Sequence, residues 1–306
     1  MTEDDVRAIF ERIKNWGRWG ESDSRGALNH ITPDLRRRAA GLVHEGVSVS
    51  CAQELNTASS ALNPCPVQHY MVKAADVAPE RGYSAVTDFI GIAAHGPAHT
   101  HIDAFCHLVF DGYSYNGVPA SAMRSTGCQG NDLTATEHGV VTRGVLLDIA
   151  ASRGVDWLDI DQPIRTEDLL RAEDAAGLRV GQGDAVIIRT GRHERARALG
   201  ETAERNEGKL HLAGMHPETL LWLHEREVSL LMSDGGHDVL PSPYPTRLPI
   251  HIGTLVFLGV HLIDNARLDD LVTACASRNR QEFLFTLAPL RLRGGTGCAV
   301  NPLATF

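Results

Sequence analysis

The chain has 306 residues and is 43% hydrophobic, which is enough apolar material for one large domain or two modest ones. It carries 29 Lys and Arg residues against 38 Asp and Glu residues, a formal net charge of -9, and no basic run indicates a nucleic-acid-binding protein. No window approaches about 18 uninterrupted apolar residues, and the acidic start differs from a signal peptide, so we expect neither a membrane span nor a leader.

The first third of the chain combines helix signals with separate strand patterns. Apolar residues at helical spacing predict a helix over residues 4–16. Residues 32–34, Thr-Pro-Asp, predict the start of a second helix, because threonine caps a helix and proline suits its first position. Strands are expected over residues 47–55 and 87–94. The long stretch between them, residues 56–83, is predicted to form a loop or lid.

The remainder of the chain continues this mixture. Strands and helices do not alternate strictly, and neither a repeat nor a composition break divides the chain. We therefore predict a single α/β or α+β domain over residues 1–306. Further strands are expected over residues 144–149, 183–189 (after a turn), 228–232 and 283–290. One helix is expected to start at residue 166 and another to cover residues 217–225. Residues 234–238 are expected to form a loop and 294–297 a turn, and residues 255–262 are apolar.

A histidine cluster is the feature most indicative of function. Four of the 15 histidines fall within residues 95–107. Because alternate residues of a strand face the same side, His99, His101 and Asp103 would share a face, with His95 and His107 in phase if the strand continues. Imidazole and carboxylate groups are ligands for Zn or Mn. This pattern indicates a metal site, and the alternative is a loop of solvated histidines.

The segment from Thr100 to His107 resembles the signature His-x-Gly-Thr-His-x-Asp-x-Pro-x-His of the cyclase family, which includes bacterial arylformamidases (kynurenine formamidases) and isatin hydrolase. The resemblance covers roughly residues 20–306 and leaves 1–20 as an N-terminal helical extension. It implies a cyclase-like β/β/α fold, with a central mixed sheet or small barrel and surrounding helices. The other matching motifs are residues 115–117, 143–145, 183–184, 189–191 and 294–297.

The chain departs from this signature at its first histidine, where it has Pro97, which cannot be a side-chain ligand. His95 and His99 flank the gap, and either could substitute. We expect His95, because His99 occupies the family's glycine position. Phe105 replaces the signature proline, which changes the shape of the pocket more than its chemistry.

The resemblance also implies roles for residues elsewhere in the chain. His251 matches a histidine that binds a second metal, and Asp264 takes the place of the family's glutamate, one residue farther along, so one or two metals remain possible. His107 matches the proton-transferring histidine, with a further ligand or a packed surface residue as alternatives. His216 and His237 are expected to bind substrate, with capping or solvent-facing roles as the alternatives.

Together these features predict a metal-dependent hydrolase whose metal ligands are His95, His101, Asp103 and His251. The expected substrate is a small non-peptide amide, imide or lactone, often cyclic, attacked by a water that Zn or Mn activates. The alternatives are a lactone or ester hydrolase of aromatic breakdown and a non-catalytic metal- or ligand-binding protein. The six scattered cysteines, with no Cys-x-x-Cys pair, indicate a reduced, cytoplasmic protein. The family implies a homodimer or homotetramer.

Overall fold

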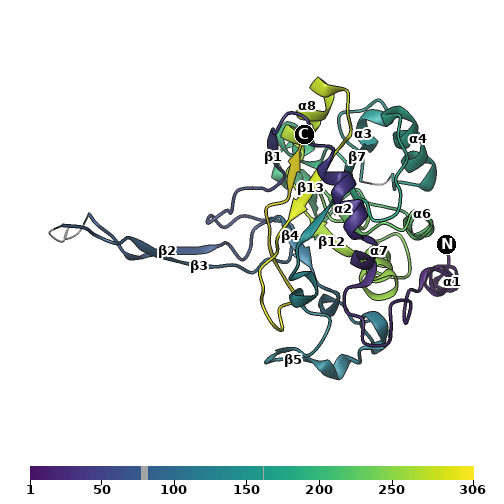
Figure 1. The fold of residues 1–306 in the computed structure, drawn as a ribbon, viewed down its shortest axis with the longest axis horizontal. Coiled ribbons are helices and arrows are strands. Elements are labelled where there is room, and N and C mark those ends of the chain that lie inside the picture. Colours follow the sequence, from purple (N-terminus) through teal and green to yellow (C-terminus); the bar gives the residue numbers. More distant parts are fainter. Residues whose placement is uncertain (77–81, 161) are drawn as a thin grey trace.

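A mixed nine-stranded sheet, curled into a half-barrel, forms the centre of the molecule (Figure 1). The computed structural model describes residues 1–76, 82–160 and 162–306. Four central strands, β7, β8, β11 and β12, run parallel, and antiparallel strands flank them on both sides. In sheet order the strands are β1 (Ser48–Ser50), β15 (Leu303–Thr305), β13 (Glu282–Leu287), β7 (Val140–Asp148), β8 (Ala185–Arg189), β11 (Leu230–Ser233), β12 (His261–Asp264), β4 (His101–Asp103) and β14 (Gly297–Ala299).

Both faces of the sheet are buried. Along β8, Val186 and Ile188 belong to one hydrophobic cluster, whereas Ala185 and Ile187 belong to the other. This explains why the central strands read as continuous apolar runs in the sequence. Helices cover the two faces: α1 (Glu3–Ile13), α2 (Pro33–Ala40), α3 (Ile149–Ser152), α4 (Thr166–Ala176), α5 (Arg192–Leu199), α6 (Thr219–Glu225), α7 (Pro249–His251) and α8 (Asp269–Arg278).

Several predicted helices and strands are confirmed to within a few residues. The apolar stripe of the first helix is buried, as its spacing predicts. The Thr32 hydroxyl accepts a hydrogen bond from the Leu35 N–H at 3.2 Å and caps α2. The helix predicted to start at residue 166 is α4, and Thr166 is its first residue. There the Asp168 carboxylate accepts the Arg165 N–H at 2.8 Å.

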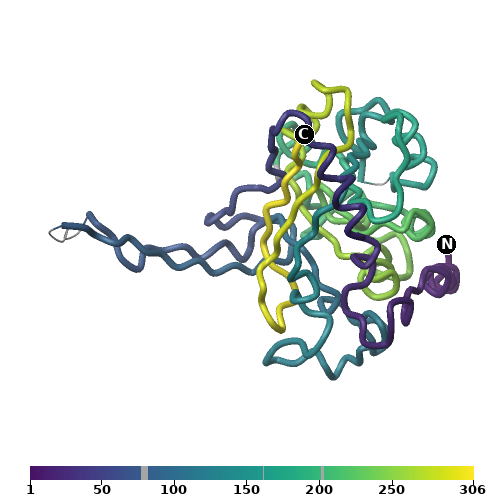
Figure 2. Tube along the Cα trace, viewed as in Figure 1, coloured from purple at the N-terminus to yellow at the C-terminus, as the bar shows by residue number. Residues whose placement is uncertain are grey.

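The prediction of an unbroken loop over residues 56–83 is wrong. Strand β2 (Gln68–Lys73) pairs antiparallel with β3 (Thr87–Gly91) in an arm that projects from the body (Figures 1 and 2). Residues 77–81 of the predicted loop lie outside the described part of the chain. Nearly every side chain of the two strands is exposed. Strand β3 lies within the predicted strand 87–94, whereas β2 has no buried face and therefore lacks the alternating pattern from which strands are recognised.

Short elements make up much of the remaining chain. The apolar segment after α7 is a π-helix, and β4 is shorter than a continuous strand through the histidine cluster would be. Among the described residues, none of the helices combines the length and the hydropathy that a membrane span requires. The short elements are β5 (Met123–Arg124), β6 (Gly127–Cys128), β9 (Arg205–Asn206), β10 (Lys209–Leu210), the π-helix η7 (Ile252–Leu258), and the 3-10 turns η1 (Gly26–His30), η2 (Phe105–His107), η3 (Tyr115–Gly117), η4 (Ala120–Ala122), η5 (Leu133–Thr136) and η6 (Glu201–Glu204).

Candidate metal centre

Strand β4 supplies two side chains of the candidate centre, His101 and Asp103, to the same face of the sheet. Its antiparallel neighbour β12 places Asp264 directly opposite His101. Both β4 residues are at most 2% exposed. The side chains of His101 and Asp103, two residues apart in the sequence, therefore lie together on one buried surface, as their spacing predicts.

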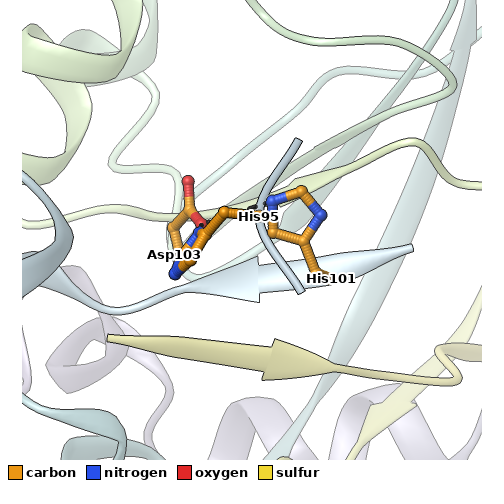
Figure 3. Close-up of side chains that lie close together, drawn as sticks. All are labelled: His95, His101 and Asp103. Carbon is orange, nitrogen blue, oxygen red and sulfur yellow. Dashed lines mark ion pairs between the residues drawn. The ribbon is translucent and has the colours of Figure 1, made fainter. Parts of the chain in front are cut away.

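His95 reaches the same point from the loop before β4 (Figure 3). Its Nδ1 lies 2.9 Å from Asp103 Oδ1, while its Nε2 hydrogen bonds with the Thr296 hydroxyl, also at 2.9 Å. His95 Nδ1 and Asp103 Oδ1 are both buried and make no hydrogen bond of acceptable geometry. Buried polar atoms without partners are costly. A cation bound between His95 Nδ1 and Asp103 Oδ1 would give both atoms the partner that they lack.

Backbone contacts fix the orientation of His101. Its Nδ1 donates to the carbonyl oxygen of His99 at 2.8 Å. Because a carbonyl can only accept, Nδ1 carries the proton and Nε2 keeps its lone pair. That Nε2 lies 3.5 Å from Asp103 Oδ1, so His95, His101 and Asp103 form a first group of potential ligands.

Asp103 also belongs to a second group. Its Oδ2 lies 3.8 Å from His251 Nε2, which lies 3.3 Å from Asp264 Oδ2. The Asp238 carboxylate accepts from His251 Nδ1 at 2.6 Å and leaves Nε2 free. The change from glutamate to aspartate at Asp264 therefore does not remove that carboxylate from the site. Two cations sharing Asp103 would fit the donor set.

The charges of the two groups are strongly interdependent. Burial alone would raise the pKa of Asp264, but His251 and His237 outweigh it and hold this pKa well below its ordinary value. Burial alone would lower the pKa of His251, yet the carboxylates of Asp264 and Asp238 raise it well above the ordinary value. The carboxylates thus favour positive charge at this point, which a metal ion would supply in place of a proton.

The centre opens into a cavity of about 170 Å³. Its lining includes the ligand-type residues and His107. It also includes four leucines, Leu210, Leu212, Leu240 and Leu248. No Lys or Arg is among the described residues that line it.

The structure places His107 beside the centre, where its ring lines the cavity and stacks on His95. Burial lowers the pKa of His107 to about 4, so its imidazole is neutral near pH 7. His237 does not line the cavity; its Nε2 lies 3.1 Å from Asp264 Oδ1. His216 is also outside the lining and pairs with Glu218 at 3.0 Å. His216 and His237 are therefore less well placed than His107 to contact a substrate in this cavity.

Three supporting residues were not identified from the sequence alone. Asp238 lies in the predicted loop 234–238 but was not assigned a role, and Thr296 lies inside the glycine motif. Gly297 permits the close packing, because a Cβ there would lie 2.6 Å from His95 Cε1 and 2.5 Å from the Ile102 carbonyl oxygen. The glycine motif was the one available signal for Thr296 and Gly297.

Comparison with known proteins decides the family. Residues 52–237 match the family described as "Putative cyclase". The chain belongs to the cyclase family. A crystal structure described as a novel cyclase is 30% identical, covers 96% of this chain and 100% of its own, and has a TM-score of 0.86. No curated protein matches the chain.

Two isatin hydrolases share the cyclase fold at lower identity. One, bound to the product analogue thioisatinate, is 16% identical over 90% of this chain and 98% of its own, with a TM-score of 0.58. Isatin hydrolase A from Ralstonia solanacearum is 19% identical over 90% and 97%, also with a TM-score of 0.58. The predicted cyclase-like fold with a central mixed sheet is thereby confirmed.

Proposed function

We propose that this cyclase-family protein is a metal-dependent hydrolase of a non-peptide amide, imide or lactone, often cyclic, acting through a metal-activated water. The observation that carries the proposal is the position of Asp103 between two groups of ligand-type atoms beside a cavity. Zn or Mn suits this mixture of imidazole and carboxylate donors. We propose His95, His101, Asp103 and His251 as ligands, with Asp264 completing the second group.

When bound, the metal would lower the pKa of a water and polarise the substrate carbonyl. The chain's own residues would do the rest. The Asp103 carboxylate holds both ligand groups together, and Asp238 keeps His251 Nε2 directed at them. His107, neutral near pH 7, can accept a proton at the cavity wall and return it to the leaving group.

The cavity lining favours a compact, uncharged substrate. Leucine side chains provide an apolar surface for the body of the molecule, while the carbonyl would lie at the ligand groups, where a bound metal would polarise it. An anionic substituent would find no Lys or Arg among the described lining residues. A neutral cyclic amide, imide or lactone meets these conditions. Lactone or ester hydrolysis in aromatic breakdown is the second candidate, because the same cavity accepts an ester carbonyl equally well.

A substrate panel tests this proposal. Full-length protein, reconstituted with Zn or Mn, is assayed against formanilides, cyclic imides, isatin and lactones, with chelator-treated protein as the control. We expect turnover of at least one neutral class and its loss on metal removal. Metal uptake without turnover of any compound would instead favour a non-catalytic binding protein. Turnover that persists in metal-free protein would contradict the proposal.

A further inference from the structure

The loop that carries His95 bends immediately after it. Gly96 has a φ of +116°, a conformation that side-chain-bearing residues rarely adopt. A Cβ at Gly96 would meet no atom within 4 Å, so the glycine serves the backbone conformation and not close packing. Pro97 follows and fixes its own φ. This turn occupies the position at which the family signature has a histidine.

Asn265, directly after β12, ties this turn to the sheet. Its side-chain amide donates to the carbonyl oxygens of Gly96 at 2.7 Å and His99 at 3.2 Å. The His99 carbonyl is the one that orients His101. The Asn265 backbone carbonyl also accepts the Thr100 hydroxyl at 2.7 Å. One residue, 1% exposed, therefore contacts both ends of the segment between the two histidines of the first group.

Arg192, at the start of α5, secures the other side of the turn. Its guanidinium donates to the Pro97 carbonyl oxygen at 3.1 Å and to Asn265 Oδ1. The same guanidinium forms a two-point ion pair with Glu204, both contacts at 2.8 Å. Arg192 and Glu204 are 8% and 1% exposed. A buried, fully engaged arginine of this kind holds its partners in one geometry.

We infer that Asn265 and Arg192 are positioning residues that hold the Gly96–Pro97 turn so that His95 replaces the ligand lost at Pro97. This inference rests on the proposed metal-dependent function. The turn brings His95 Nδ1 to 2.9 Å from Asp103 Oδ1. It also leaves His99 to act through its backbone carbonyl, because the His99 ring belongs to neither group of converging ligand atoms among the described residues. His95 is therefore the ligand and His99 is part of its support.

Zn²⁺ titration of the metal-free full-length protein against a competing chelating dye tests the inference. Gly96→Ala alters the turn without a steric clash, and Asn265→Ala removes its main hydrogen bonds. Gly20→Ala is the matched control, because Gly20 also has a positive φ, +102°, and open space around its Cβ but lies in the N-terminal loop. We expect Gly96→Ala and Asn265→Ala to weaken Zn²⁺ binding about 10- to 100-fold, the range for residues that support a ligand.

Gly20→Ala should bind Zn²⁺ like the wild type, and so should His99→Ala, whereas His95→Ala should lose more affinity than either turn variant. If Asn265→Ala does not fold, Gly96→Ala still decides the question. Equal Zn²⁺ affinity of Gly96→Ala and wild type, or a loss in His99→Ala as large as that in His95→Ala, would overturn the inference while leaving the proposed function intact. A wild-type protein that binds no Zn²⁺ or Mn²⁺ would overturn the proposed function itself, and this inference with it.

Discussion

The imidazole rings of His95 and His107 lie face to face, with centroids 3.9 Å apart and planes inclined by 8°. His95 directs Nδ1 at Asp103, whereas His107 belongs to neither group of converging ligand atoms among the described residues. The stacking brings a second imidazole to the cavity without adding a ligand. Under the proposed function, this arrangement would separate metal binding at His95 from proton transfer at His107.

The first prediction follows from this separation. His107→Asn should retain the metal, and turnover should fall about 100- to 10,000-fold, the range for a lost general acid or base. Metal content by elemental analysis and the rate on the best panel substrate are the two measurements. Loss of metal would make His107 a ligand and would move the proton-transfer role elsewhere, with His216 and His237 the next candidates.

Asp238 should act through His251. Its carboxylate accepts hydrogen bonds from the His251 Nδ1–H at 2.6 Å and from the Ile250 backbone N–H at 2.7 Å. Asp238→Ala should weaken metal binding about 10- to 100-fold. Asp148→Ala is the control, because that residue caps α3 through the Ala151 N–H. Equal metal affinity of the two variants would show that Asp238 does not orient a ligand.

The hairpin arm supports the expected homodimer or homotetramer. Tyr70, Val72 and Ile90 are 56%, 65% and 54% exposed. An isolated two-stranded hairpin is at best marginally stable, and exposed apolar surface favours association. Light scattering at micromolar concentration should give a multiple of 33.2 kDa. Tyr70→Ser with Ile90→Ser should lower that mass, and Leu170→Ser on α4 should not. A monomeric wild type would contradict this proposal.

Protonation of the Asp168 carboxylate at low pH should lower the free energy of unfolding. Burial alone would raise the pKa of this carboxyl, but the Arg153 guanidinium at 2.6 Å and the Arg165 N–H outweigh it and lower the pKa. A carboxyl whose pKa is lower in the folded state stabilises above its unfolded pKa, near 4, and loses this effect as the pH falls through the folded value.

Asp168→Asn should therefore lower the free energy of unfolding at pH 7 by roughly 1–3 kcal/mol, the scale of a charged hydrogen bond. The difference from wild type should shrink below about pH 4, as the wild-type carboxyl takes up its proton. Urea unfolding at a series of pH values measures it. A difference that stays constant from pH 7 to pH 3 would rule out this ionic contribution.

Local patterns in the sequence predicted those features of the structure that depend on residues close together in the chain. The Thr32 cap and the shared face of His101 and Asp103 depend on residues two or three positions apart, and both are present. The approach of His95 depends on Asn265, more than 160 residues away, which no periodicity reveals. Strand β2 of the exposed arm lacked a signal for the opposite reason, because all of its side chains are exposed, whereas β3 lies within a predicted strand.

Metal binding by Asp103→Asn is the most direct test of the account. Asparagine keeps the shape of the side chain but removes the charge shared by both ligand groups. Wild-type protein should bind Zn or Mn, and the variant should lose that binding by more than the 10- to 100-fold typical of supporting residues. If Asp103→Asn retains full metal occupancy and full activity, the centre does not lie at Asp103 and the account is wrong.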